Sequence, residues 1–192
     1  MAIAGLYKIF DHWHQQGTVH IISDTHFGDE ELRAGFPDRP TDEDIVKSIN
    51  AKVGRKDTLI ILGDVGSVDL LRQLRGYKVL VMGNHDAGRS NYEGVCQEIY
   101  EGPLMISEKL ILSHEPVDVP WAFNLHGHNH QGGSNDDHHF NVCADVIDYT
   151  PINFNQFVKS GFLSKVETIH RETINTAIKK KAKRGGKKIR KH

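Results

Sequence analysis

Short apolar runs rich in β-branched residues recur along the first two thirds of the chain, and each is followed by Asp, His or Asn. The five runs lie at residues 19–22, 59–62, 79–82, 110–112 and 122–125. Runs of this length between polar segments predict buried strands. Because the carboxyl ends of neighbouring strands meet at one edge of an α/β sheet, we expect the polar residues that follow them to converge.

Helical spacing separates several of these strands. Residues 42–53 place Ile45, Ile49 and Val53 on one face, and Thr41 can cap their first turn. Shorter helices are predicted at residues 68–74, 92–100 and 153–159, and a capping box at Ser164 predicts a helix from 164 to about 181. Residues 3–10 favour an amphipathic helix, with a strand as the alternative.

The second half of the chain consists mainly of predicted strands. Residues 104–107 and 110–113 form a hairpin around a turn at 108–109, and residues 139–144 form a further strand. The polar residues 27–40, with two Gly and two Pro, predict a loop at the mouth of the site. Strands alternating with helices, followed by a run of strands, predict an α/β fold, a mixed two-sheet sandwich flanked by helices.

The segments that follow the strands carry side chains that divalent metals bind. These side chains belong to Asp24, His26, Asp64, Asn84, His114, His128 and His130. Residues two apart in an extended chain face the same side, so each Asp-x-His or His-x-His pair can bind one metal or two adjacent ones. Taken singly, a turn-forming Asp or a hydrogen-bonded core His explains each segment. Together, imidazole, carboxylate and amide donors without thiolate favour two borderline divalent metals.

One family signature combines these segments in this order. The chain resembles the calcineurin-like metallophosphoesterases in Asp24-x-His26, Gly63-Asp64, Gly83-Asn84-His85-Asp86, His114 and Gly127-His128-x-His130. Residues 141–154 resemble the corresponding segment of small bacterial and phage members. The resemblance implies a four-layer α/β/β/α sandwich with two mixed β-sheets and a dinuclear metal site at the strand C-terminal ends.

The resemblance also assigns a role to each residue. The first metal would be held by Asp24, His26, Asp64 and His130. The second would share Asp64 and add Asn84, His114 and His128. His85 would face the substrate, oriented by Asp86, and act as a general acid or stabilise charge on the phosphoryl oxygens.

Two cations about 3.5–4 Å apart can hold a bridging hydroxide as nucleophile and clamp the oxygens of an in-line displacement at phosphorus. We therefore expect a metal-dependent phosphoesterase that hydrolyses phosphodiesters, with phosphomonoesters as a further substrate class. Members of the family are commonly active with Mn or Fe, which we expect here; Zn, Co and Ni suit the same ligands.

The chain departs from the protein-phosphatase branch of this family at two motifs. Gly63-Asp64 is not followed by the Asp-Arg-Gly motif of that branch, and the third motif ends in Asp86 where that branch has Glu. The phosphate-gripping arginine is therefore missing from its usual place, which favours the phosphodiesterase-like branch. Arg89 could substitute for it, although an exposed loop arginine is the simpler interpretation.

Charge is distributed unevenly along the 192 residues. The net charge is −1, but residues 178–192 carry nine Lys or Arg and no acid, which leaves 15 basic and 25 acidic residues in the remainder. We expect a phosphoesterase domain at residues 1–177, with an N-terminal extension at 1–17, and a disordered basic tail at 178–192. The two distant cysteines, Cys96 and Cys143, are expected to be reduced packing residues in a cytoplasmic protein, and no apolar run suits a membrane span.

Two other functions fit the same residues. A nuclease could use the same metal centre and hold nucleic acid with the basic residues 179–191, although a solvated tail also explains them. A non-catalytic metal-binding scaffold could retain the fold for protein binding. His126 could support the site or simply be a hydrogen-bonded strand residue, and His138 and His139 are expected at the surface.

Overall fold

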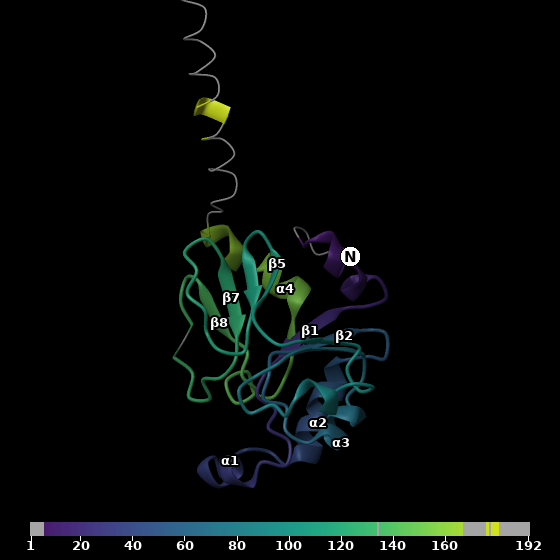
Figure 1. The fold of residues 1–192 in the computed structure, drawn as a ribbon. Helices are drawn as coiled ribbons and strands as arrows, with labels where there is room; N and C mark the ends of the chain where they lie inside the picture. The colour runs from purple at the N-terminus through teal and green to yellow at the C-terminus, as the bar shows by residue number, and fades with distance from the viewer. Residues whose placement is uncertain (1–5, 134, 167–175, 177, 181–192) are drawn as a thin grey trace, which may run out of the picture.

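Two mixed β-sheets form the centre of the fold (Figure 1). The computed structural model describes residues 6–133, 135–166, 176 and 178–180. The first sheet has the order β4-β3-β2-β1-β9, with β9 (Ile152–Asn153) antiparallel to β1 and the other strands parallel. Its parallel strands are β1 (Val19–Ile22), β2 (Thr58–Ile61), β3 (Tyr77–Val81) and β4 (Glu98–Tyr100).

The second sheet has the order β5-β6-β7-β8. Its strands are β5 (Leu104–Ser107), β6 (Leu110–Leu112), β7 (Phe123–His126) and β8 (His139–Asn141). The predicted hairpin is confirmed, because β5 and β6 pair antiparallel, whereas β6, β7 and β8 run parallel. The carboxyl ends of β6 and β7 can therefore present side chains at one edge, like those of β1 to β3.

A shared apolar core holds the two sheets together. Val19 and Ile21 from β1 belong to the same buried cluster as Leu112 of β6 and Leu125 of β7. Alternate residues along a strand face opposite sides, so the other residues of β1 and β2 turn outward into a second cluster. There, Leu59 and Ile61 pack with Ile45 and Ile49 of the helix that covers the sheet.

Helices lie on both sides of the paired sheets, which confirms the predicted α/β fold with two mixed sheets. On the outer face of the first sheet lie α2 (Asp42–Lys52) and α3 (Val68–Gln73). On the other side, α4 (Phe154–Lys159) packs beside the second sheet: the Phe157 ring lies 5.6 Å from that of Phe123 and 5.4 Å from that of Phe140. The 3-10 helix η3 (Phe162–Lys165) follows it.

Three local predictions were wrong. The N-terminal helix, η1, is a 3-10 helix at Lys8–His14, whereas Leu6 forms a β-bridge and residues 1–5 lie outside the described part. The predicted loop at 27–40 contains α1 (Glu30–Gly35), which buries no residue and so leaves no apolar periodicity to detect. The predicted helix at 92–100 is a turn followed by β4, because Gly94 adopts φ 81° and the chain then joins the sheet.

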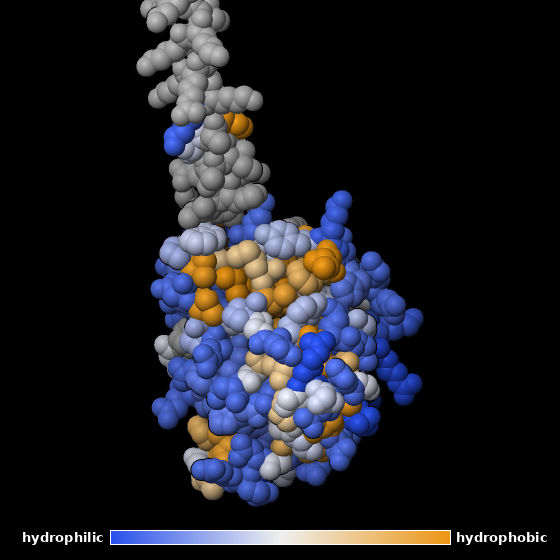
Figure 2. All heavy atoms as spheres, in the orientation of Figure 1, coloured by the Kyte–Doolittle hydropathy of each residue, from blue (hydrophilic) through white to orange (hydrophobic). Residues whose placement is uncertain are grey.

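The C-terminal predictions fall mostly outside the described residues. Residues 167–175, 177 and 181–192 are not described, so most of the helix predicted at 164–181 and of the basic tail is not tested. The predicted start at Ser164 was also wrong, because Ser164 lies within η3 and Val166 is extended, whereas residues 176 and 178–180 are helical. No helix in the described part is long and apolar enough to cross a membrane. The face of the body seen in Figure 2 is mainly hydrophilic, with an apolar patch over the second sheet.

The cap of α2 offers a test of this architecture. The Thr41 hydroxyl accepts a hydrogen bond from the Asp44 N–H at 3.2 Å, whereas Ser67, the N-cap of α3, makes no such bond. Thr41→Ala should therefore lower the free energy of unfolding by about 1 kcal/mol, and Ser67→Ala by much less. Urea unfolding of both variants measures the difference, and equal losses would contradict the capping role.

Candidate metal centre

The loops after five strands meet at one edge of the paired sheets. The predicted ligands follow β1 (Asp24, His26), β2 (Asp64), β3 (Asn84), β6 (His114) and β7 (His128, His130). The structure brings all seven into one continuous cluster, in which every member has another member's side-chain donor atom within 3.6 Å. Asp24, His26, Asp64 and His114 are buried.

The backbone at this edge is strained. Asp24, His26, Asp64 and His128 all have positive φ, at 57°, 41°, 52° and 68°. This left-handed conformation is uncommon for residues with a Cβ and costs on the order of 1–3 kcal/mol each. Such strain persists only where surrounding contacts enforce it, and here it coincides with four of the seven predicted ligands.

Gly127 allows the second sheet to reach the first. A Cβ at this position would collide with the side chains of Ser23 and Asp24. Without it, the His128 N–H donates to both oxygens of the Asp24 carboxylate, at 2.9 and 3.1 Å. The glycine of the Gly127-His128 motif is therefore required by the close approach of two loops.

One group of donors forms around Asp24 and Asp64. Nε2 of His26 lies 3.5 Å from Asp64 Oδ2, and Nε2 of His130 lies 3.6 Å from Asp24 Oδ1. The buried His26 Nε2 has no hydrogen-bond partner among the described residues. The oxygens of Asp24 and Asp64 and a nitrogen of His26 lie close enough together to hold one ion.

A second group shares Asp64. Nε2 of His114 lies 3.2 Å from Asp64 Oδ2, 2.8 Å from Asn84 Oδ1 and 3.1 Å from His128 Nδ1. Asn84 Oδ1 also lies 3.1 Å from His128 Nδ1. Asp64, His114 and His128 form a further group able to hold an ion, so the Asp64 carboxylate stands between two potential sites.

Three imidazoles are oriented by acceptors outside the cluster. Nδ1 faces Asp29 Oδ2 at 3.0 Å in His26, the Leu62 carbonyl at 2.9 Å in His114, and Asp145 Oδ2 at 2.6 Å in His130. In each neutral ring, the proton belongs on Nδ1, and the Nε2 lone pair then points at a buried carboxylate. Histidines that bind metals are held in this way, so the donor set fits divalent cations.

The buried carboxylates also change the pKa values of the cluster. Burial opposes protonation of His114, but Asp64 and Asp24 outweigh it and raise the His114 pKa to about 9. Burial opposes ionisation of Asp64, yet its bond to His114 holds the pKa of that carboxyl well below its usual range. Without a metal, a proton on His114 therefore offsets part of the negative charge.

Three residues that orient the site were not predicted. Asp29 and Asp145 orient His26 and His130, and the buried Arg39 guanidinium pairs with Asp145 at 2.5 Å. Arg39 also donates to the carbonyls of Thr25 and Asp24, at 2.6 and 3.2 Å. Asp145 could have been found, because it follows the predicted strand at 139–144 as the other acids follow theirs. The polar stretch around Arg39 carried no such signal.

Asp86 does not take the role expected of it. Its carboxylate accepts the N–H groups of Asp64, Val65 and Gly83 at 2.8–3.0 Å, and the Tyr92 hydroxyl at 2.9 Å. We expected it to orient His85. With both oxygens bound to the loops after β2 and β3, Asp86 instead fixes the ligand-bearing backbone.

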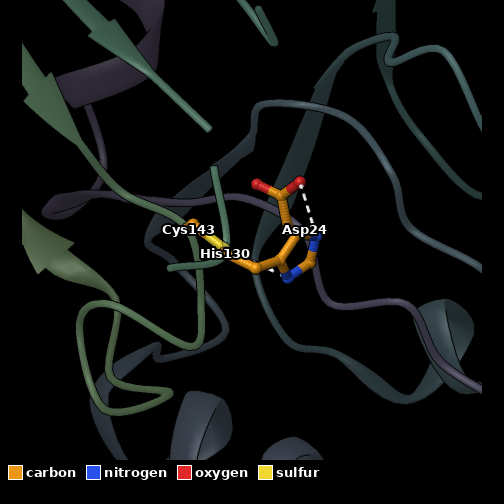
Figure 3. A group of neighbouring side chains, drawn as sticks. All are labelled: Asp24, His130 and Cys143. Atoms are coloured by element: carbon orange, nitrogen blue, oxygen red, sulfur yellow. Dashed lines mark hydrogen bonds and ion pairs between the residues drawn. The ribbon is translucent and has the colours of Figure 1, made fainter. Parts of the chain in front are cut away.

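The cysteines pack in the interior, as predicted. Cys96 belongs to the outer apolar cluster, and Cys143 lies beside Asp24 and His130 (Figure 3). Burial raises the pKa of the Cys143 thiol, and its sulfur lies 3.6 Å from Nδ1 of His130, the nitrogen that already faces Asp145. A neutral thiol at this position supports the ring and leaves the Nε2 atom to the cluster.

The other side chains considered for the site have partners outside the cluster of predicted ligands. Arg89 donates to the Ile99 carbonyl at 2.8 Å and pairs with Glu93, so it is engaged outside the cluster. His126 is a buried strand residue whose Nδ1 faces the Gly127 carbonyl at 2.8 Å. His139, the first residue of β8, is half-buried, and its Nδ1 faces Asp136 Oδ1 at 2.9 Å in the surface loop at 135–138.

Solved structures provide comparisons for this fold. The chain is similar to AQ665 from Aquifex aeolicus, a protein of unknown function, with 26% identity and a TM-score of 0.63 over 74% of this chain and 98% of that one. The nuclease MPE of Pseudomonas putida is 24% identical over 58% of this chain and 61% of its own, with a TM-score of 0.44. Yfce, a phosphoesterase from E. coli, is 17% identical over 66% and 78%, with a TM-score of 0.36. No protein-family model and no curated protein matches the chain.

The His114 pKa predicts how metal binding depends on pH. Below about pH 9 a bound cation must displace the His114 proton. Affinity should therefore rise by at least about tenfold per pH unit from pH 7 to 9 and then level off. A second proton can contribute, because burial opposes protonation of His26 but Asp64 outweighs it and raises the His26 pKa. Anaerobic Mn²⁺ titrations of the wild type and His114→Gln measure this, and an equally steep rise in the variant would contradict the assignment.

Proposed function

We propose that the chain is a dinuclear metal-dependent phosphoesterase that hydrolyses phosphodiesters. The observation that carries the proposal is the arrangement of His26, His114 and His130. Each ring is held at Nδ1 by an outer acceptor and turns Nε2 toward a buried carboxylate. Asp64 belongs to both donor groups, as a shared ligand of two cations would.

The residues would divide between two cations. One would be held by Asp24, His26, Asp64 and His130. The other would be held by Asp64, Asn84, His114 and His128. Bound divalent metals would supply Lewis acidity that activates water and offsets charge on the phosphoryl oxygens. The oxygen and imidazole donors suit Mn or Fe, which we propose, and also accept Zn, Co or Ni.

His85 is the proposed proton donor. Its N–H donates to Asp64 Oδ1 at 2.9 Å, and its exposed side chain lines a cleft of about 430 Å³ that also contacts Asp64, His26 and His130. In the hydrolysis, a water oxygen bonds to phosphorus as the bond to the leaving oxygen breaks. A proton from His85 passes to that oxygen, giving an alcohol and a phosphomonoester.

The charge of the cleft favours diesters over monoesters. None of the described residues that line it is Lys or Arg, and Asp29 and Glu31 lie at its rim. A phosphodiester carries one negative charge, whereas a monoester approaches two at neutral pH. With no Lys or Arg among the residues described there, mainly the bound cations would offset the phosphate charge, and a diester leaves them less charge to offset.

A pair of chromogenic substrates tests this function. Metal-stripped protein refilled with Mn²⁺ should hydrolyse bis-p-nitrophenyl phosphate faster than p-nitrophenyl phosphate. His85→Ala should retain both metals and lose about 100-fold in kcat with dialkyl esters such as dimethyl phosphate, whose leaving alkoxide must be protonated, but less with p-nitrophenyl esters. His138→Ala in the surface loop should match the wild type. No metal-dependent turnover of either ester would refute the proposal and favour a scaffold, and strong turnover of oligonucleotides would identify a nuclease.

The shared position of Asp64 makes a separate prediction. Asp64→Asn removes the charge that stands between the two donor groups and should weaken binding of both cations together. Equilibrium dialysis with metal analysis measures the stoichiometry, and Asp136→Asn in the surface loop serves as the matched control. Selective loss of one cation would show that Asp64 is not shared.

A further inference from the structure

Two clefts with no lining residue in common adjoin the donor cluster. The first, which we call the α1 cleft, measures about 430 Å³ and lies between the cluster and α1, with Leu32 and Phe36 on its wall. The second, the Asn84 cleft, measures about 290 Å³ and is lined by Asn84 and His114 together with residues of the loops after β4 and β6. Each cleft has its own wall residues, and both reach predicted metal ligands.

The clefts meet at the cluster itself. His128 lines the α1 cleft and Asn84 lines the Asn84 cleft, and His128 Nδ1 lies 3.1 Å from Asn84 Oδ1. A phosphoryl group bound over these donors would adjoin both clefts. We propose that the two clefts receive the two ester groups of a phosphodiester, the leaving group in the α1 cleft and the retained group in the Asn84 cleft.

The position of His85 determines which group leaves. His85 lines the α1 cleft together with His26 and Asp64, and it is absent from the described lining of the Asn84 cleft. A proton donor must reach the oxygen whose bond to phosphorus breaks. The ester group beside His85 is therefore the one that departs as an alcohol.

The wall of the α1 cleft suits a planar or apolar leaving group. The half-buried Phe36 ring lies 5.8 Å from the His130 ring, and Leu32 stands beside it. No residue of α1 is buried in the core, but polar bonds fix the helix in place: Asp29 caps it, and Arg33 pairs with Asp42 at 2.7 Å. An aromatic ring entering this cleft would gain both apolar contact and ring stacking.

Acidic side chains restrict both ester groups. Asp29 and Glu31 line the α1 cleft, Glu101 and Glu115 line the Asn84 cleft, and neither cleft has a Lys or Arg among its described residues. An ester group that carries a further phosphate would be repelled on either side. The substrate class is therefore a small phosphodiester with uncharged ester groups, at least one of them aromatic or apolar.

This inference rests on the proposed phosphodiesterase function, but binding can test it without catalysis. Diphenylphosphinate and dimethylphosphinate carry the same central anion with large or small groups, and neither has an ester bond to hydrolyse. Calorimetric titration into Mn²⁺-supplied protein should show that Phe36→Ala weakens diphenylphosphinate about five- to tenfold and leaves dimethylphosphinate unchanged. Val117→Ala, in the Asn84 cleft, should also weaken only the diphenyl compound.

The double variant shows whether the groups occupy separate clefts. If the two phenyl groups occupy separate clefts, the double variant should lose diphenylphosphinate affinity by the product of the two single fold-changes. Independent sites contribute additively to the binding free energy. Tyr77→Ala, at the amino end of β3, is the control for loss of a partly exposed aromatic ring. Equal weakening of both phosphinates by Phe36→Ala, or no weakening, would overturn the inference.

Kinetics with methyl p-nitrophenyl phosphate assign the sides. Release of p-nitrophenol requires the aryl group in the α1 cleft, so Phe36→Ala should raise KM several-fold and Val117→Ala should not. The reverse result would exchange the two clefts. Failure of the wild type to hydrolyse any diester would refute the proposed function, whereas turnover that is insensitive to Phe36→Ala would refute only the present inference.

Discussion

The candidate metal centre depends on how closely the two sheets approach at the carboxyl end of β1. Ser23 makes two backbone hydrogen bonds to the segment after β8. Its N–H donates to the Val142 carbonyl at 3.0 Å, and its carbonyl accepts from the Ala144 N–H at 2.9 Å. One residue later, the Asp24 carboxylate accepts the His128 N–H from the other sheet. Any side chain at position 127 would push these loops apart. Donors from different sheets can surround one ion only because this contact is so short.

Acidic residues at this edge have two structural roles. Asp24 and Asp64 face the cluster, whereas Asp29, Asp86 and Asp145 hold the groups that face it. Asp145 is bound by His130, Tyr149 and Arg39, and although burial opposes its ionisation, these partners lower its pKa to about 2. The hydrogen bonds of these outer carboxylates can keep strained loops and imidazole rings in place.

The sequence predicted the donors better than their supports. The seven predicted ligands could be found because each follows an apolar run whose strand character is a local property. Arg39 and Asp86 bind backbone groups of other loops, and no local pattern encodes such contacts. The same limit explains β4: the buried spacing of Tyr92, Cys96 and Ile99 suits a helix, and only pairing with β3 makes the last of them a strand residue.

The long separation between the joined loops has a kinetic consequence. Asp24 and His128 lie 104 residues apart in sequence, and both sheets must be in place before they can touch. Closing so large a loop is slow relative to forming a helix or a hairpin, so this contact belongs to the late steps of folding. Partly folded chains would display carboxylates and imidazoles without assembling them. A metal that binds only the folded state would then stabilise it after the rate-limiting step. It would slow unfolding more than it speeds folding.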